Sequence, residues 1–316
     1  MKAVRIHQYG DPSVLQYEEA PPPIMHPEDV ILTVVAAGVN PIDWKIRQGQ
    51  LKTIIPYSLP LTLGMDVAGT ILRVGDKVTQ FAFGDAVYAK TEILRLGAYA
   101  ENTGVRAGMV ALAPKSITLA EAAGIPLAAT TAWTALFDDA RIKPGQTILI
   151  HAASGGVGMF AVQLAKYWKA KVIATTSGSN TDMVKSLGAD EDIDYRTEDF
   201  SARVKEVDVV LDAIGGETQT NSFKLVRKGG ILLSLTGPVD EEVAKHHGVT
   251  AKAVQGRSDG ARLRKIAELV DNGVLKVMIG EEFPLHEARA AHELSESGHA
   301  VGKILLRVGP GAVSGS

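Results

Sequence analysis

A run of very small residues between an apolar segment and a helical pattern is the first feature of this chain that could do chemistry. Residues 145–166 read GQTILIHAASGGVGMFAVQLAK. The apolar run at 148–150 is typical of a buried parallel strand, and the apolar positions after residue 158 can pack a helix on its sheet. A turn without side-chain bulk lets a helix N-terminus approach a pyrophosphate. The segment therefore predicts a dinucleotide phosphate site whose contacts are Ser154, Gly155, Gly156, Val157 and Gly158.

The end of the next strand indicates which dinucleotide is bound. Enzymes that use NAD usually carry an acid there, about twenty residues beyond the glycine turn. Here residues 172–175 run into Thr176 and then into small donors, so the expected contacts are Ser177, Gly178, Ser179 and Asn180. An acid would repel the 2′-phosphate of NADPH, whereas hydroxyl and amide donors would accept it. The turn favours NADPH, and Asp182, which lies past it in a helical stretch, is expected to face solvent.

The composition agrees with a soluble enzyme of two domains. The chain has 316 residues, of which 46% are hydrophobic and 22% charged, and its net charge is -3. That charge gives no electrostatic case for nucleic acid or for an anionic membrane. A membrane span needs about 18 consecutive apolar residues, which the chain lacks, and its first residues do not resemble a signal peptide, so we expect a cytoplasmic protein. The absence of cysteine excludes disulfides and thiolate metal sites.

The elements that must position these turns divide the chain into a β-rich front, an alternating middle and a short return segment. Up to about residue 120, short apolar runs are separated by Pro and Gly, as in a small barrel. The next part predicts parallel strands at 147–151, 171–175, 207–212, 231–235 and 250–254. A helix at 261–272 and a last strand at 303–308 follow, and this strand is expected to rejoin the front domain. The tail at 309–316, GPGAVSGS, is expected to be disordered.

The block at 145–166 resembles the zinc-independent quinone oxidoreductase branch of the medium-chain dehydrogenase/reductase superfamily. The matching positions are Gly145, Leu149, Ala153, Ser154, Gly155, Gly156, Gly158, Gln163 and Lys166. The segments GVNPIDWKIRQG, PLTLGMDVAG, SLGADEDIDYR and GHAVGKILL are most similar to plant and bacterial alkenal/enone and quinone reductases. The resemblance implies an α/β protein with a GroES-like β-barrel substrate domain at 1–120 and 257–316. A Rossmann domain with a doubly wound parallel sheet would occupy 121–256.

The same resemblance implies that no metal is used. Zinc-dependent members carry a cysteine ligand where Asn40 stands, and a His-Glu pair where Met65 and Asp66 stand. Asn, Met and a lone Asp do not form a zinc site of the nitrogen and sulfur type. Oxidation of an alcohol through a metal-bound alkoxide is therefore not expected. Hydride transfer to an acceptor that is already electrophilic remains, such as a quinone or an α,β-unsaturated carbonyl compound.

Further cofactor contacts follow from matched positions and from the ends of strands. The resemblance implies that Tyr195 reaches the 2′-phosphate, that Thr131 lies near the nicotinamide ribose and that Lys303 approaches the cofactor from the return segment. Their alternatives are ordinary packing, a helix cap and a solvated surface lysine. Where relatives often have a lysine in the phosphate turn, this chain has Asn180. Strand ends, where ligands of such sheets collect, add Ile214, Leu235 and Thr236.

Three residues are candidates for stabilising the oxyanion that hydride transfer creates. Lys45 matches a lysine near cofactor and substrate in relatives, and its ammonium would suit a developing enolate. Asn40 and Tyr57 are further candidate donors. A surface cation, a turn-forming Asn and a packed loop aromatic are the respective alternatives.

Two other classes of function stay open. A methyltransferase also has a glycine-rich loop after its first strand, but it normally needs an acid at the end of the second, where this chain has Thr and Ser. A protein that binds NADPH with little turnover is harder to separate, because the acid-base residues are few. The expected partner is a quinone or enone substrate, and the resemblance implies a homodimer.

Overall fold

The computed structural model describes residues 1–308, which form two compact units. The first contains Met1–Leu127, Ser258–Gly273 and the residues from Val277 onward, and the second contains Ala128–Arg257 and Val274–Lys276. The sequence placed the domain limits at 120 and 256. The short segment before Val277 belongs to the second unit, and there the Lys276 amide donates to Gln163 Oε1 at 2.7 Å. The tail expected to be disordered lies outside the described residues.

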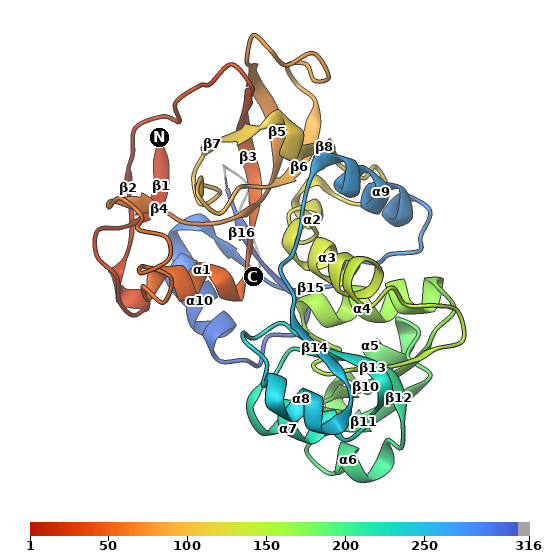
Figure 1. Cartoon of the computed structure of the whole chain (residues 1–316). Coiled ribbons are helices and arrows are strands. Elements are labelled where there is room, and N and C mark those ends of the chain that lie inside the picture. Colours follow the sequence, from red (N-terminus) through yellow and green to blue (C-terminus); the bar gives the residue numbers. More distant parts are fainter. Residues whose placement is uncertain (309–316) are drawn as a thin grey trace. The chain divides into compact units, whose positions relative to one another are not determined.

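A six-stranded parallel sheet organises the second unit, in the order β11-β10-β9-β12-β13-β14 (Figure 1). Its strands are β9 (Thr147–Ile150), β10 (Lys171–Thr176), β11 (Glu191–Asp194), β12 (Val207–Asp212), β13 (Val226–Ser234) and β14 (Thr250–Ala253). Its helices are α3 (Pro126–Trp133), α4 (Gly156–Tyr167), α5 (Thr181–Ser186), α6 (Phe200–Arg203), α7 (Gly216–Phe223) and α8 (Glu241–His247), and a π-helix spans Thr134–Asp139. Helices α4 and α5 pack against β9 to β11, whereas α7 and α8 pack against β12 to β14. This arrangement confirms the Rossmann-type α/β domain.

The apolar runs of the predicted central strands form the middle of this sheet. Residues 148–150 of β9 are fully buried, and β12 on its flank is buried over most of its length. Helix α4 is buried along residues 158–165, since its apolar side chains cover the sheet. Burial on both sides explains why these strands read as continuous apolar runs rather than as alternating ones.

Strand β11 is an element that the sequence did not predict. It pairs in parallel with β10, with Thr176 opposite Asp194. Only Ile193 of its four residues is buried, and the others are Glu or Asp, which are depleted in strands. Pairing with β10 therefore overrides a weak local preference, and it brings the end of β11 beside the turn that follows β10.

Two sheets organise the first unit. A three-stranded sheet contains β1 (Lys2–Ile6), β2 (Leu15–Glu19) and β4 (Leu61–Thr62). A seven-stranded sheet contains β3 (Asp29–Val39), β5 (Asp66–Val74), β6 (Ala86–Lys90), β7 (Asn102–Arg106), β8 (Val110–Leu112), β15 (Ile279–Pro284) and β16 (Lys303–Arg307). The helices are α1 (Pro41–Arg47), α2 (Leu119–Ala122), α9 (Gly260–Asp271) and α10 (Ala288–Glu296).

The return segment closes this larger sheet, as the sequence predicted. Strand β16 pairs antiparallel with β3, with Ile304 opposite Val39, so the two ends of the chain share one core. Buried apolar residues of β3, β5, β6 and β16 form that core. The start of β16 therefore lies beside the end of β3, which leads directly into α1.

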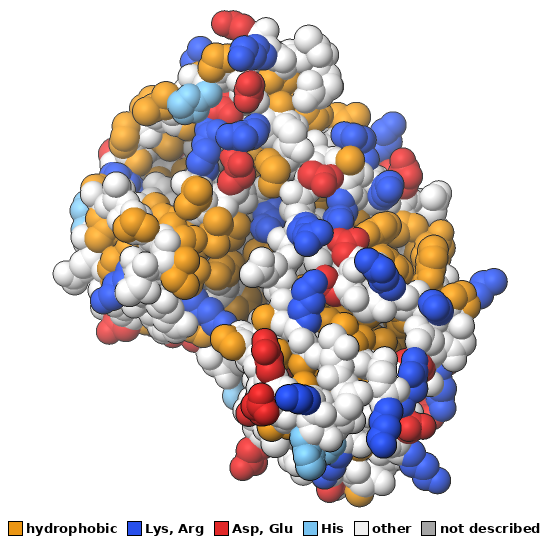
Figure 2. All heavy atoms as spheres, in the orientation of Figure 1, with side chains coloured by type: hydrophobic (Ala, Val, Ile, Leu, Met, Phe, Trp, Pro, Cys, Tyr) orange, Lys and Arg blue, Asp and Glu red, His pale blue; other side chains and the backbone are white. Residues whose placement is uncertain are grey.

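Two further features are the distribution of charged side chains on the surface and the length of the helices. On the face shown in Figure 2, Lys and Arg side chains are interspersed with Asp and Glu. Within residues 1–308, none of the helices has the length and apolar character needed to cross a bilayer.

Candidate functional site

The carboxyl ends of four neighbouring parallel strands bring the glycine turn, the turn after β10, Ile214, Leu235 and Thr236 to one edge of the second unit. Chain order reverses between β9 and β12, which are adjacent in the sheet although β10 and β11 separate them in sequence. Ligands of open α/β sheets bind at such a switch point, beyond the carboxyl ends of the strands. The glycine turn follows β9, the hydroxyl turn follows β10, Ile214 follows β12 and Leu235 follows β13.

The glycine turn brings the first turn of α4 close to the backbone that follows β9. Gly155 precedes α4 with φ of −80°, and no side-chain hydrogen bond caps this helix. A Cβ atom on Gly158 would lie 2.3 Å from the carbonyl oxygen of Ala152, so only glycine allows the helix to start this close to the turn. Ser154 provides a hydroxyl, and the amides of Gly156 and Val157 lie in the first turn of α4. Residues 154–158 thus make a cradle at a helix N-terminus that fits a pyrophosphate.

Hydroxyl and amide groups of two turns meet in one cluster. Thr176 Oγ1 donates to Ser154 Oγ at 3.0 Å, which joins the turn after β10 to the glycine turn. Asn180 Nδ2 donates to Ser177 Oγ at 3.0 Å and to Ser154 Oγ at 3.4 Å. Ser177 and Ser179 hydroxyls are 3.1 Å apart. The structure therefore brings together the donors that the sequence assigned to the ribose phosphate.

A carboxylate that the sequence analysis missed lies against this turn. A Cβ atom on Gly178 would be 2.5 Å from Asp194 Oδ2, so the two groups are in contact. Tyr195, the next residue, is 53% exposed, and the Arg196 guanidinium lies 5.9 Å from the centre of its ring. Tyr195 is therefore a surface residue that directly follows β11, and its contact with the 2′-phosphate stays a prediction. Asp182, by contrast, is exposed on α5, as expected.

The remaining predicted contacts of the second unit follow strands or lie in a helix. Ile214 is 53% exposed, and its amide donates to Asp212 Oδ1 at 2.9 Å. Thr236 is exposed, while Leu235 is half-buried and donates its amide to the Asp212 carbonyl at 2.8 Å. Thr131 lies inside α3, so the helix-cap alternative is wrong for it.

A buried polar cluster lies where β3, β5 and β16 begin or end in the first unit. Asn40 Nδ2 donates to Asp66 Oδ2 at 2.9 Å, and Asn40 Oδ1 accepts from Lys303 Nζ at 2.5 Å. Lys303 Nζ also reaches the Val39 carbonyl at 3.3 Å and lies 3.9 Å from Asp66 Oδ2. Lys303 is 3% exposed, so the solvated surface alternative for this lysine is wrong.

Burial shifts the pKa values of the two ionisable groups in this cluster, Asp66 and Lys303, in opposite directions. It raises the pKa of Asp66, although the Lys303 ammonium and the Asn40 amide oppose the rise. Burial also lowers the pKa of Lys303, against the attraction of Asp66 and Asp43. The two charges therefore stabilise each other in a place where neither would be stable alone.

A chain of hydrogen bonds extends from this cluster to α10. Asp43 Oδ2 accepts from the backbone N–H of Asn40 at 2.9 Å and from the Tyr99 hydroxyl at 3.0 Å. His292 Nε2 lies 3.3 Å from that hydroxyl, and its Nδ1 accepts from Arg47 at 3.1 Å. Because Arg only donates, the His292 proton is on Nε2. Burial, with help from Arg47, lowers the pKa of His292 to about 3. The imidazole is therefore neutral.

Asp43 is the carboxyl group in this chain of bonds, and its pKa is raised. Burial raises the pKa of Asp43 to about 7, and the Asp66 carboxylate adds to the rise, whereas hydrogen bonds from Asn40 and Tyr99 oppose it. Its Oδ1 atom is buried and accepts no hydrogen bond from residues 1–308. Asp43 and Asn40 together form the capping box of α1. This pair therefore helps to orient the short helix that carries Lys45.

The other two catalytic candidates are more accessible than Asn40. Lys45 is half-buried on α1, with its ammonium 5.6 Å from the centre of the Trp44 ring. The Tyr57 hydroxyl donates to the Ile93 carbonyl at 2.8 Å. Burial raises the pKa of Tyr57 to about 12, with Tyr9 and Asp43 adding to the rise. Asn40 joins Lys303 and Asp66, whereas Lys45 and Tyr57 make none of the hydrogen bonds of that cluster among residues 1–308.

Comparison with known proteins decides the family. The alcohol dehydrogenase GroES-like domain family matches residues 26–125, and the zinc-binding dehydrogenase family matches residues 187–306. An Arabidopsis thaliana NADPH-dependent alkenal/one oxidoreductase from the chloroplast is 37% identical over 97% of this chain and 79% of its own. The chain belongs to the quinone and enone reductase branch of the medium-chain dehydrogenase/reductase superfamily.

Two solved structures show the same fold over nearly the whole chain. The quinone oxidoreductase from Coxiella burnetii is 33% identical, covers 98% of this chain and 99% of its own, and has a TM-score of 0.92. The Escherichia coli quinone oxidoreductase complexed with NADPH is 30% identical, covers 98% and 100%, and has a TM-score of 0.87. This medium-chain reductase is thus an oxidoreductase with a GroES-like domain and a Rossmann-type, NAD(P)-dependent domain.

Sequence reasoning missed Asp43, Asp66 and Asp194 as parts of these sites. Asp66 was considered only as a residue that does not make a zinc site. One signal was present in the sequence, since Lys303 heads the apolar run of residues 304–306 and such a lysine needs a buried partner. Asp194 could be found only by knowing that β11 pairs beside β10.

Proposed function

We propose that this medium-chain reductase transfers hydride from NADPH to a quinone or to an α,β-unsaturated carbonyl compound without using zinc. The single observation that carries the cofactor proposal is the donor cluster in which Thr176 and Asn180 both meet Ser154. The accessible donors of this cluster, on Ser154, Ser179 and Asn180, offer hydrogen bonds to a 2′-phosphate at the edge of the glycine cradle. The similarity to the E. coli enzyme complexed with NADPH supports the same cofactor.

The contacts at Asn40 support a reaction without zinc. In zinc-dependent relatives a zinc ligand stands at the position of Asn40. Here the side-chain amide of Asn40 instead makes hydrogen bonds to Asp66 and Lys303. Met65, at the other such position, is 3% exposed within the apolar core. Among residues 1–308, His, Cys, Asp and Glu do not gather in any group of three that could hold a metal ion. The ammonium of Lys303 is the cation of this cluster.

The proposed mechanism needs only binding, orientation and stabilisation of an oxyanion. NADPH, when bound, supplies the hydride. For an enone, addition at the β-carbon moves the electron pair of the double bond onto the carbonyl oxygen, and a proton completes the reduction. Residues 154–158 would hold the pyrophosphate, and Ser177, Ser179, Asn180 and Tyr195 the ribose phosphate. Lys45 and Asn40 are the proposed donors toward the oxyanion, and Tyr57 would join them by exchanging its hydrogen bond to the Ile93 carbonyl for one to the oxyanion.

This function is tested by following the loss of NADPH absorbance after adding each compound of a panel of quinones, alkenals and enones. We expect consumption with at least one acceptor, undiminished after dialysis against a strong metal chelator, and a higher kcat/KM for NADPH than for NADH. Tight NADPH binding without consumption of any acceptor would instead favour a binding protein. Loss of activity on chelation, restored by zinc, would contradict the metal-free mechanism.

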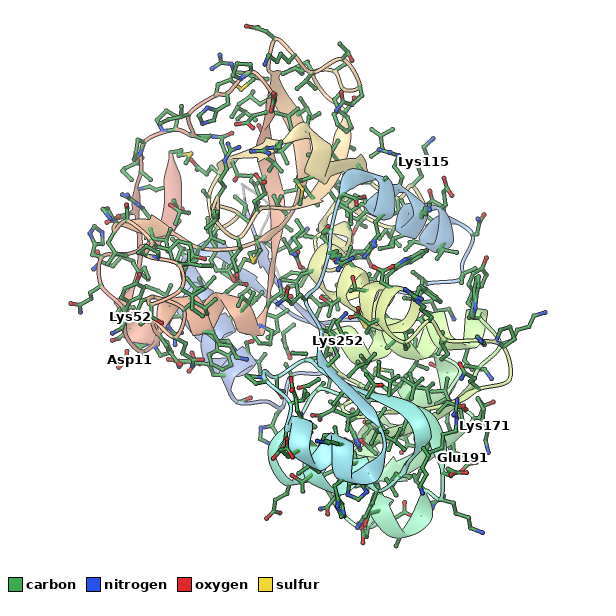
Figure 3. The ribbon with its side chains drawn as sticks, viewed as in Figure 1. Asp11, Lys52, Lys115, Lys171, Glu191 and Lys252 are labelled. Carbon is green, nitrogen blue, oxygen red and sulfur yellow. The ribbon has the colours of Figure 1, made fainter. Side chains whose placement is uncertain are left out.

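Replacement of Lys45 tests the accessible donor. We expect Lys45→Ala to lower kcat about 10-fold or more, because removal of one oxyanion donor typically costs at least that much. Lys52→Ala is the control, since Lys52 is an exposed lysine that follows the same helix (Figure 3). Unchanged kcat and KM in Lys45→Ala would remove Lys45 from the mechanism.

A further inference from the structure

The buried lysine of the first unit makes contacts that differ from those expected of a cofactor contact. Sequence similarity implied that Lys303 touches the cofactor. Its ammonium instead donates to Asn40 Oδ1 and to the Val39 carbonyl, with Asp66 at 3.9 Å. Taking an ammonium and a carboxylate out of water is unfavourable for each ion, so the burial of this pair destabilises the fold unless the two charges are paired.

The two charged partners specify one orientation of the Asn40 amide. An ammonium can only donate and an ionised carboxylate can only accept. Lys303 therefore selects the oxygen of the amide and Asp66 selects its nitrogen. A flipped amide would set NH₂ against NH₃⁺ and oxygen against carboxylate. Asn40 is thus held in one of its two orientations by electrostatics as well as by packing.

One hydrogen of this amide is still able to serve an acceptor. The first Nδ2 hydrogen is directed to Asp66 at 2.9 Å, whereas the second reaches only the Gly38 carbonyl at 3.5 Å, at the limit of a hydrogen bond. A cation on the oxygen of an amide polarises its N–H bonds and strengthens them as donors. The Lys303 contact therefore improves the donor that the proposed mechanism assigns to Asn40.

We propose that Lys303 and Asp66 are positioning residues that act through Asn40, holding its amide so that the weakly bonded second Nδ2 hydrogen is left to be donated to the oxyanion formed by hydride transfer. This inference rests on the proposed function. It replaces direct contact with the cofactor as the role of Lys303. The same three side chains then do in this chain what a metal and its ligands do in zinc-dependent relatives: they fix a positive group at the end of β3.

A double-mutant cycle separates action through Asn40 from direct contact with the cofactor. We expect Lys303→Met to lower kcat at least 10-fold while the KM of the acceptor and the Kd of NADPH stay within 3-fold. In the Asn40→Ala background, Lys303→Met should change kcat less than 2-fold. Lys171→Met is the matched control, because Lys171 is an exposed lysine paired with Glu191 at 2.7 Å (Figure 3), and it should leave kcat unchanged. An equal loss of kcat in both backgrounds, or weaker NADPH binding as the main effect, would overturn the proposal.

A spectroscopic readout keeps the test independent of turnover. The side-chain amide of Asn40, assigned in a ¹⁵N correlation spectrum by its loss in Asn40→Ala, should shift in Lys303→Met and stay in place in Lys171→Met. If Lys303→Met does not fold, Lys303→Met/Asp66→Asn, which leaves neither buried charge, replaces it in both measurements and should shift the same resonance. If the wild-type enzyme reduces no acceptor, the proposed function fails. An unmoved resonance would instead overturn the positioning role, whatever the turnover.

Discussion

At the scale of single residues, Asp194 places a carboxylate against the turn that is proposed to hold a 2′-phosphate. It contacts Gly178, and it shares the turn with donors that favour the phosphate. Like charges near each other disfavour binding, so this carboxylate would weaken the preference for NADPH over NADH. The sequence suggested that no acid lies at this turn. With Asp194 beside it, we expect the preference between NADPH and NADH to depend on a balance between one acid and several donors.

Replacement of Asp194 should therefore sharpen the cofactor preference. We expect Asp194→Asn to raise the ratio of kcat/KM for NADPH to that for NADH by about 5-fold, which corresponds to about 1 kcal/mol. Asp182→Asn is the control, because Asp182 is an exposed carboxylate on the adjacent helix α5. A ratio that stays at the wild-type value in Asp194→Asn would show that this acid does not sense the phosphate.

Asp43 gives a second prediction at this scale, on stability and pH. Burial raises the pKa of Asp43 to about 7 from the ordinary value of 3.8. Between these values the folded state holds a proton that the unfolded state has released, so the contribution of Asp43 to the free energy of unfolding falls as pH rises. The slope is at most about 1.4 kcal/mol per pH unit.

Asp43→Asn isolates this contribution, because an Asn oxygen can still accept from Asn40 and Tyr99. We expect the free energy of unfolding of wild type, measured in urea, to decline relative to that of Asp43→Asn from about pH 4 to about pH 7, and the difference to level off above. The comparison is needed because His292, whose pKa is about 3, contributes with the opposite sign over much of this range. Parallel curves for the two proteins would contradict a raised pKa.

At the scale of elements, the glycine turn requires close contact between β9 and α4. A Cβ atom on Gly158 would meet the Ala152 carbonyl at 2.3 Å, and that oxygen belongs to the backbone of the turn. We expect Gly158→Ala to cost about 1–3 kcal/mol of stability, since overpacking moves the backbone, and to raise the Kd of NADPH at least 10-fold. Thermal unfolding and fluorescence titration measure both effects.

Gly108→Ala is the control for this change. An added Cβ there has no atom within 4 Å, and Gly108 is not among the glycines with positive φ. It should leave the Kd of NADPH and the melting temperature close to wild type. Full NADPH affinity in Gly158→Ala would mean that the turn adapts and that the close approach is not required for binding.

Sequence patterns predicted some elements and not others for physical reasons. The strands at 147–151 and 207–212 are buried on both sides, so their apolar runs are visible without any knowledge of neighbours. Strand β11 pairs with β10, but its acidic residues are not typical of a strand, so its own sequence does not predict it. The Asn40, Asp66 and Lys303 cluster joins three strands that are distant in the chain, so no local pattern contains it.

At the scale of the whole molecule, the assembly state is still a prediction. The resemblance implies a homodimer, and the cytoplasmic location is equally a prediction. Strand β14 pairs with β13 on one side and, among residues 1–308, with no strand on the other. Such an edge can pair with a second copy of the same strand. The Val254 amide donates to the Ser234 carbonyl in β13, so by the alternation of a strand the amide of Ala253 faces away from β13.

Proline at Ala253 should therefore block pairing across this edge and keep the pairing within the unit. We expect sedimentation velocity to give the wild type about twice the chain mass of 33.5 kDa and to give Ala253→Pro the mass of one chain. Ala253→Ser, which keeps the amide, should stay dimeric. A wild type that sediments as a single chain would contradict the homodimer itself. A dimer that persists in Ala253→Pro would place its interface elsewhere than the β14 edge, because a strand without that amide loses the hydrogen bond that edge pairing needs.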